Sequence, residues 1–215
     1  DGIKYFFGGE NASEQSKNRT TGDGIIIPTN YLQSAYYLHR IEHPFGDIIY
    51  LEYENPINYS LVVSKSEHRS IVPIGSAGEP SSSQSTTSQY VENGRFLKKI
   101  YSNRSNLIIE FNSSGEFVSP NYFRKLNNII IKDDVSNNQL QGVSLNYDNS
   151  IVGGKLQRFF LTEVVFSNQL STAEFRYSMS YKDIDALPER FSTDQDHMGY
   201  FNNKGNGDIR LPNND

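Results

Sequence analysis

The chain has 215 residues, a formal net charge of −5 and an isoelectric point near 5.4, a balance that argues against a nucleic-acid-binding protein. Hydrophobic residues make up only 36% of it, and the absence of cysteine excludes disulfides, cysteine-ligated metal sites and thiol nucleophiles. The longest aliphatic runs are three residues, far short of the roughly 20 that a membrane helix needs.

The distribution of apolar residues favours strands over helices. Val, Ile, Tyr, Phe and Thr cluster in short runs that are separated by Asn, Gly, Ser and Asp. We therefore predict one all-β segment over residues 1–215, built as an antiparallel β-hairpin meander with little helix. At its start, residues 8–24 are polar and predict a long loop, and residues 29–37 are a weak helix candidate.

Four segments share one pattern: Leu, two residues, Ile or Val, a polar turn, then alternating apolar residues that end in Tyr or Phe. They run from Leu38 to Tyr53, from Leu97 to Phe111, from Leu126 to Tyr147 and from Leu161 to Tyr177. Each is predicted to be a β-hairpin whose outgoing strand carries three apolar residues on one face. A single hairpin is marginally stable in water, so we expect the four to stack side by side.

Two further stretches differ from this pattern. Residues 75–94 are mostly Gly, Ser, Thr and Pro and predict a second long polar loop. Residues 180–189 have room for one or two helical turns before Pro188. The segment that follows, residues 187–202, reads LPERFSTDQDHMGYFN.

The first hairpin resembles the RHS/YD-repeat family, whose unit runs L-x-x-I-x-x-P-x-G-x-x-I-x-x-x-Y. The residues that match are Leu38, Ile41, Pro44, Gly46, Ile49 and Tyr53. Residues 1–9 and 187–202 are similar to two further patterns, found in the variant typical of very large bacterial secreted and surface proteins. In the second of these the matching residues are Leu187, Pro188, Arg190, Gln195, Asp196, His197, Gly199 and Tyr200, with Met198 where Trp is usual.

The resemblance implies a structural, non-enzymatic role. In such proteins a β-sheet ribbon forms a shell around a C-terminal toxin domain, or a carrier at the cell surface. The implied partner is the remainder of the same polypeptide or adjacent subunits of an assembly, and the implied location is the bacterial envelope or the medium. Because the chain begins at Asp1 rather than Met, we expect a piece of a longer polypeptide.

The candidate chemical groups are weak as catalytic or metal sites. Asp196 and His197 form an acid–imidazole pair, which we expect to fix a tight turn with Tyr200 packed beneath it. His39 and His43 have helical spacing for zinc but lack the accompanying Glu, and Pro44 follows at once. An acidic calcium loop starting at Asp183 lacks the glycine and glutamate it would need. We assign no catalytic, cofactor or metal residue.

A glycan-binding β-sandwich of a surface protein is the alternative function. Such modules expose aromatic side chains beside Asn and Asp, and this chain has more tyrosines than one thin sheet would hide. They include Tyr31, Tyr36, Tyr37, Tyr50, Tyr59, Tyr101 and Tyr122. This alternative predicts a closed sandwich with a concave face that carries two or more coplanar tyrosines.

Overall fold

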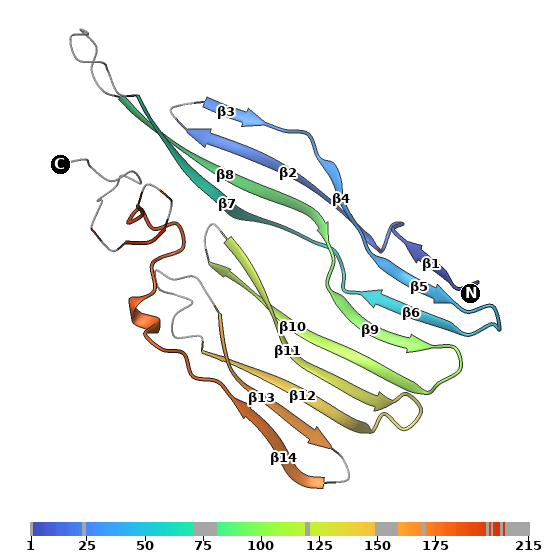
Figure 1. Cartoon of the computed structure of the whole chain (residues 1–215). Helices are drawn as coiled ribbons and strands as arrows, with labels where there is room; N and C mark the ends of the chain where they lie inside the picture. Colours follow the sequence, from blue (N-terminus) through green and yellow to red (C-terminus); the bar gives the residue numbers. More distant parts are fainter. Residues whose placement is uncertain are drawn as a thin grey trace, which may run out of the picture.

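Strands account for nearly all regular structure in the computed structural model, which describes residues 2–22, 25–70, 81–118, 121–148, 159–168, 171–196, 198, 200–202 and 204 (Figure 1). The strands are β1 (Lys4–Phe7), β2 (Ser13–Gly22), β3 (Ile25–Pro28), β4 (Leu32–Tyr36), β5 (Leu38–Glu42), β6 (Ile48–Tyr53), β7 (Ile57–Ser70), β8 (Ser81–Gly94), β9 (Leu97–Ser102), β10 (Leu107–Val118), β11 (Asn121–Asp133), β12 (Gln139–Asp148), β13 (Phe160–Asn168) and β14 (Ser171–Ser178). One turn of 3-10 helix, η1, spans Ile184–Ala186, inside the segment with predicted helical turns. The all-β, antiparallel fold class is thus confirmed.

The larger of two sheets is a meander in which consecutive strands pair, except where β2 to β4 and β7 and β8 leave it for the smaller sheet. Its strand order is β1-β5-β6-β9-β10-β11-β12-β13-β14, and every pairing is antiparallel. All four predicted hairpins are present, as β5–β6, β9–β10, β11–β12 and β13–β14. Figure 1 shows the ends where each hairpin turns following one another along a single margin of the sheet.

The smaller sheet corrects both predicted loops. Its strand order is β3-β2-β8-β7, with β4 also paired to β2. The predicted loop at 8–24 therefore holds strand β2, and the predicted loop at 75–94 holds β8; residues 23–24 and 75–80 lie outside the described residues. The helix candidate at 29–37 was also wrong, because Leu32–Tyr36 is β4.

Hydroxyl groups explain why such polar segments form strands. The Oγ1 atoms of Thr20 and Thr87 lie 2.9 Å apart across β2 and β8, and the Oγ atoms of Ser66 and Ser85 lie 2.7 Å apart across β7 and β8. Cross-strand hydroxyl pairs of this kind stabilise a sheet even where few apolar side chains are available. A composition rule that equates Ser and Thr with loops misses them.

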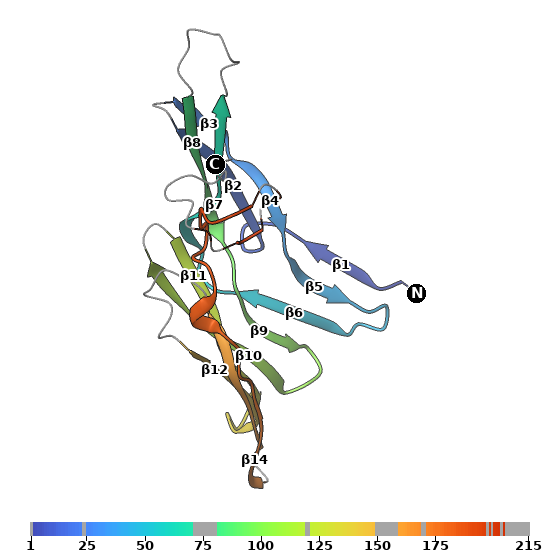
Figure 2. The ribbon, with the colours of Figure 1, turned by 60° about the vertical axis from the view of Figure 1, so that its left-hand side comes forward.

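The apolar core is small for a chain of this length. Among the described residues the buried hydrophobic side chains are Ala12, Val62, Val91, Ile108, Phe160 and Val165. Figure 2 shows the reason: β9 to β14 follow one thin, twisted layer instead of two stacked sheets. None of the described helices is long and apolar enough to cross a membrane.

We predict that Ile108→Ala lowers the free energy of unfolding by about 3 kcal/mol, because removing a buried aliphatic side chain leaves a cavity. The Ile108 side chain is only 2% exposed, between Tyr101 and Lys132 on the neighbouring strands. Ile109→Ala is the matched control, since Ile109 is next in sequence, points to the other face and is half-exposed. Denaturant unfolding measures both; equal losses would contradict the assignment of the core.

Candidate functional site

One face of the large sheet is apolar from β5 to β14. Registers between neighbouring strands place like residues opposite each other, for example Leu51 with Ile100 and Val143 with Phe166. We call this set the apolar face; its members are Ile41, Ile49, Leu51, Ile100, Leu107, Ile109, Phe111, Ile129, Ile131, Val143, Leu145, Val164, Phe166, Phe175 and Tyr177.

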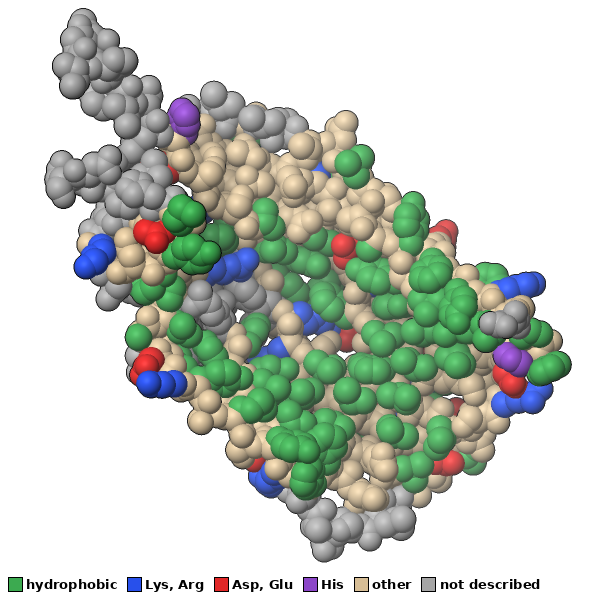
Figure 3. All heavy atoms as spheres, viewed as in Figure 1, with side chains coloured by type: hydrophobic (Ala, Val, Ile, Leu, Met, Phe, Trp, Pro, Cys, Tyr) green, Lys and Arg blue, Asp and Glu red, His purple; other side chains and the backbone are tan. Residues whose placement is uncertain are grey.

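The apolar face is open to solvent. None of its members is buried, and Phe175 and Tyr177 are 58% and 56% exposed. Figure 3 shows hydrophobic side chains spread over the middle of the sheet, with charged groups mainly at its margins. A hollow of about 330 Å³ lies on this face, among Ile129, Ile131 and Phe166. Contiguous exposed apolar surface of this kind marks an interaction site in soluble proteins.

The opposite face is polar and its charges are paired within the sheet. The Lys132 Nζ lies 2.7 Å from a Glu110 carboxylate oxygen, and Arg176 Nη1 lies 3.1 Å from Glu163. The Glu163 carboxylate also accepts a hydrogen bond from the Asn146 amide, and these two partners lower its pKa, the Asn146 hydrogen bond most. The two faces thus differ in chemistry: this one carries the paired charges around the buried side chains of Ile108 and Val165, and the other is apolar and open.

A repeated β-bulge explains the Leu-x-x-Ile/Val spacing. In an unbroken strand, residues three apart point to opposite faces. Where each hairpin meets the strand before it, the register shifts by one residue, so that three steps on the incoming strand match two on its neighbour. The pairs are Tyr5–Ile41 with Phe7–Leu38, Leu51–Ile100 with Tyr53–Leu97, Phe111–Ile129 with Ser113–Leu126, and Leu145–Val164 with Tyr147–Leu161.

A tyrosine hydroxyl closes three of the four hairpins at their open ends. Tyr53 donates to the Leu38 carbonyl at 2.7 Å, Tyr147 to the Leu126 carbonyl at 2.9 Å and Tyr181 to the Leu161 carbonyl at 2.8 Å. Burial raises the pKa of both Tyr53 and Tyr147. Each bond joins the end of the outgoing strand to the Leu that begins its own hairpin.

This geometry corrects the predicted end of two hairpins. Within the units, the residues opposite the Ile or Val are Ile49, Ile109, Val143 and Tyr177. Tyr53 and Tyr147, which close the first and third units, lie four residues after these partners. The same count gives Ser113 in the second unit and Tyr181 in the fourth, not Phe111 and Tyr177 as the sequence pattern predicted. The sequence repeat is therefore offset from the structural one by two residues in the second unit and by four in the fourth.

We predict that Tyr147→Phe lowers the free energy of unfolding by about 1 kcal/mol, the typical net value of one hydrogen bond. The Leu126 carbonyl would lose the Tyr147 hydroxyl while the ring stays in place. Tyr177→Phe is the control, because that side chain is largely exposed. Chemical denaturation measures the free energy of unfolding of both variants. An equal loss in Tyr177→Phe would contradict the role of the Tyr147 hydroxyl in closing its hairpin.

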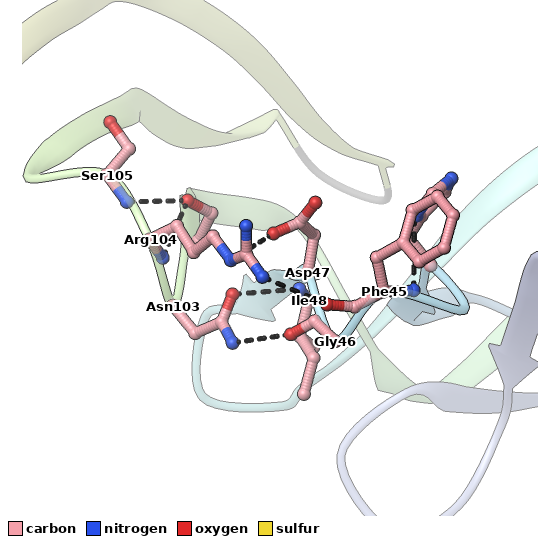
Figure 4. A network of polar contacts seen from close by, with 9 residues as sticks. Phe45, Gly46, Asp47, Ile48, Asn103, Arg104 and Ser105 are labelled. Atoms are coloured by element: carbon pink, nitrogen blue, oxygen red, sulfur yellow. Dashed lines mark hydrogen bonds and ion pairs between the residues drawn. The ribbon is translucent and has the colours of Figure 1, made fainter.

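The turns of the first two hairpins are joined by polar contacts (Figure 4). Asn103 accepts a hydrogen bond from the Ile48 backbone N–H at 2.8 Å and donates to the Gly46 carbonyl at 2.9 Å. Arg104 donates to the Phe45 carbonyl and forms an ion pair with Asp47. Gly46 has a φ of +87°, a conformation that favours glycine, which explains the Gly of the predicted motif.

The other residues of the first motif have structural positions. The Leu38 carbonyl accepts the Tyr53 hydroxyl, and Ile41 is paired between Tyr5 and Ile49 on the apolar face. Pro44 lies in the turn against Gly2: a Cβ at Gly2 would come within 2.7 Å of the Pro44 ring. The motif thus shapes a hairpin and does not gather reactive groups.

The second motif runs along β7 of the small sheet. Arg190 donates a hydrogen bond to the Val62 carbonyl at 3.1 Å, and the Lys65 ammonium lies 5.8 Å from the centre of the Phe191 ring. Leu187, which precedes Pro188, closes η1 through its backbone bond to the Ile184 carbonyl. This contact brings residues more than a hundred positions apart together and attaches the end of the described chain to the small sheet.

Asp196 forms the predicted tight turn. Its carboxylate accepts backbone hydrogen bonds from Met198 at 2.8 Å and from Tyr200 at 2.9 Å, and Gln195 bridges to Phe201 beside it. The expectation that Tyr200 packs beneath the turn was wrong, because that side chain is 72% exposed. His197 and Gly199 lie outside the described residues.

A cluster of half-buried polar and aromatic groups joins the two sheets. Arg124 of β11 forms an ion pair with Glu54 and donates to the Ser113 hydroxyl at 2.9 Å, while its guanidinium lies 4.3 Å from the centre of the Phe96 ring. The Tyr122 ring packs 5.4 Å from Tyr59 of β7. This cluster connects the small sheet to the large one. No spacing in the sequence indicated it, because its members come from four separate segments.

Several of the tyrosines named for glycan binding pack against another tyrosine ring. The rings of Tyr50 and Tyr101 lie 5.1 Å apart with 22° between their planes, and Tyr37 packs 5.3 Å from Tyr53. Of the seven named, only Tyr36 is exposed and the rest are half-buried. Rings that pack on each other hide part of their surface, which leaves less of these side chains open to a ligand.

Tyr101 gives a test of these contacts at alkaline pH. Its hydroxyl donates to Glu52 at 2.7 Å, and this bond, together with burial, raises its pKa to about 12. A tyrosine in the unfolded chain ionises near pH 10, so the stabilisation is complete below about pH 10 and is lost as the pH rises towards 12. We predict that the free energy of unfolding falls less steeply across this window in Tyr101→Phe. Denaturant unfolding of both proteins near pH 10 and near pH 12 measures the difference. An equal fall of the free energy of unfolding in wild type and variant would contradict the role of the Tyr101–Glu52 hydrogen bond.

The described residues contain no group of three or more His, Asp or Glu side chains that could hold a metal ion. Comparison of the chain with models of protein families, with curated proteins and with solved structures finds no match. Fold and site together define a class: an antiparallel hairpin-repeat protein whose large sheet is apolar on one face and polar on the other.

Proposed function

We propose that this chain is a non-enzymatic structural segment of a large RHS/YD-repeat-like polypeptide, secreted or displayed at a bacterial surface, where its large sheet forms part of a β-sheet shell or ribbon. The observation that carries the proposal is the apolar face, which extends over eight strands and remains solvent-exposed in the described residues.

The energetics of the sheet support a packed partner. Burial of apolar surface contributes about 25 cal/mol per Å², so a sheet that leaves this much uncovered forgoes a large share of its stability. Sheets normally meet face to face about 10 Å apart with interdigitating side chains. The remainder of the same polypeptide, or an adjacent subunit, fits this requirement by supplying a second apolar layer.

The repeat geometry supports the family resemblance. Four junctions share one bulge and one register, as expected if the units descend from a common pattern. The N-terminal segment adds Gly8, at a φ of +79°, where a Cβ would come within 2.8 Å of the Tyr36 ring. Glycine is therefore required at that position of the similar motif. The implied cargo of such a shell is a C-terminal effector.

Two measurements on the native protein test the proposal. The intact mass of the native species that carries this sequence is expected to be far above 24.4 kDa, the mass of these 215 residues. Oxidative footprinting of the native species should then show Phe166, Phe175 and Tyr177 protected, and the same side chains reactive in the 215-residue chain alone at a dilution where it is monomeric. A native species of 24.4 kDa, or equal reactivity in both samples, would refute the proposal.

A further inference from the structure

The last strand of the large sheet repeats the geometry of strands that are already paired on both sides. Strands β6, β10 and β12 are each the outgoing strand of a hairpin, and each pairs along its outer edge with the incoming strand of the next unit. Strand β14 is the outgoing strand of the fourth hairpin. Among the described strands it pairs with β13 alone (Figure 1).

The positions that would receive an incoming strand can be found by counting residues from Tyr177 of β14. In the three earlier units, the residue two places after the within-hairpin partner faces the next Ile or Val, and the residue four places after it faces the next Leu. Tyr177 is that partner in the fourth unit, so the equivalent positions are Met179 and Tyr181. The Tyr181 hydroxyl bond to the Leu161 carbonyl confirms the count, because Tyr53 and Tyr147 make the same bond from the same position.

The outer edge of β14 also has its backbone donors in the required places. The Met179 N–H bonds inward to the Thr162 carbonyl at 2.8 Å. Since backbone donors alternate between the two edges of a strand, the N–H group of Ser178 points outward. An edge that no other described strand pairs with is a template for a further strand.

We infer that the outer edge of β14, together with the residues that directly follow it, is a docking site for an extended strand of sequence Leu-x-x-Ile/Val, bound antiparallel with its Ile or Val opposite Met179 and its Leu opposite Tyr181. This inference rests on the proposed function and says which kind of strand the large sheet binds at its β14 edge. The occupant forms a fifth junction, with the bulge seen at the other four. Its Leu and Ile or Val extend the apolar face by one strand.

The probe is a fluorescein-labelled peptide of residues 95–102, RFLKKIYS, an incoming strand of this chain's own repeat. Fluorescence anisotropy with the 215-residue chain should show saturable binding. The control peptide has the same composition with residues 97–100 reordered to Lys-Leu-Ile-Lys, so that Leu and Ile cannot both reach one face. We expect the control to bind at least about tenfold more weakly, a difference of about 1.4 kcal/mol.

Two protein variants place the peptide on β14. Ser178→Pro removes one outward N–H, which an edge strand tolerates, and should weaken binding at least about tenfold. Ser178→Ala keeps the N–H and should bind like the wild type. Because Ser178→Pro carries a risk of local unfolding, Met179→Asn serves as a second variant, with the far-ultraviolet circular dichroism of both required to match the wild type.

Three results would overturn the inference: no binding of the peptide, equal binding of the reordered peptide, or binding unchanged in both Ser178→Pro and Met179→Asn. Pairing of β14 with β14 of a second copy, seen as a dimer that Ser178→Pro dissociates and the peptide does not, would also overturn it. These failures are separate from a failure of the proposed function. Protection of Phe166 in the native species tests the cover of the apolar face, and peptide binding tests only the edge.

Discussion

The 215-residue chain by itself will self-associate and bind hydrophobic dyes, and the double variant Leu107→Lys/Phe166→Lys will be monomeric. Both residues lie on the apolar face of inner strands, at 47% and 39% exposure. Association of two such faces removes apolar surface from water, and each buried aromatic contributes about 150–250 Å². Two lysines add like charges where the faces meet, while their side chains keep the strands intact.

The matched control adds the same charge to the polar face. Asn112→Lys/Ser144→Lys places two lysines on strands β10 and β12, at exposed positions whose side chains point away from the apolar face. This control should associate as the wild type does. Light scattering after size-exclusion chromatography and dye fluorescence measure the outcome. A monomeric wild-type chain, or equal effects of the two variants, would show that the apolar face does not drive association.

Glu54→Gln is expected to lower the free energy of unfolding by about 3 kcal/mol. Its carboxylate pairs with Arg124, and the two side chains are only 25% and 13% exposed. Breaking such a pair leaves a cation that cannot regain full hydration, and the cost exceeds the net value of the intact pair. The Phe96 ring and the Ser113 hydroxyl offset only part of that cost. Denaturant unfolding followed by circular dichroism measures this loss in the free energy of unfolding.

Two further variants separate the pair from other effects at the junction. Glu54→Gln/Arg124→Met removes both charges and should recover most of the lost stability, because well-packed apolar replacements are often neutral at buried pairs. Asp47→Asn breaks the solvent-exposed ion pair with Arg104 and should cost less than about 1 kcal/mol. A Glu54→Gln loss as small as that of Asp47→Asn would mean that the junction is not held by this ion pair.

The sequence predicted the hairpins because their information is local. Alternation of apolar and polar residues on strands such as β6 and β12 is set by the two-residue period of a strand, and the turn of the first hairpin requires glycine at Gly46. The Asp196 turn was predictable for the same reason: its carboxylate bonds to backbone groups two and four residues ahead.

The sequence misled where stability depends on distant partners. Segments β2 and β8 appeared to be loops because their hydroxyl side chains are stabilised by partners on distant strands, as in the pairing of Thr20 with Thr87. Tyr200 was expected to be covered, but no local pattern reports what lies above a ring. The shift of the closing position to Ser113 and Tyr181 follows from the pairing register inside those two hairpins, which a degenerate repeat does not specify.

By itself, then, the sequence determined an all-β meander, its four hairpins and the side chains that share a face, since each follows from spacing along one strand. The tertiary structure alone decided that a bulge brings Leu and Ile or Val to the same face, that Glu54 meets Arg124, and that the apolar face remains uncovered. Register between strands and burial depend on which distant segments meet. That choice is made by the summed energy of the whole sheet and not by any one segment.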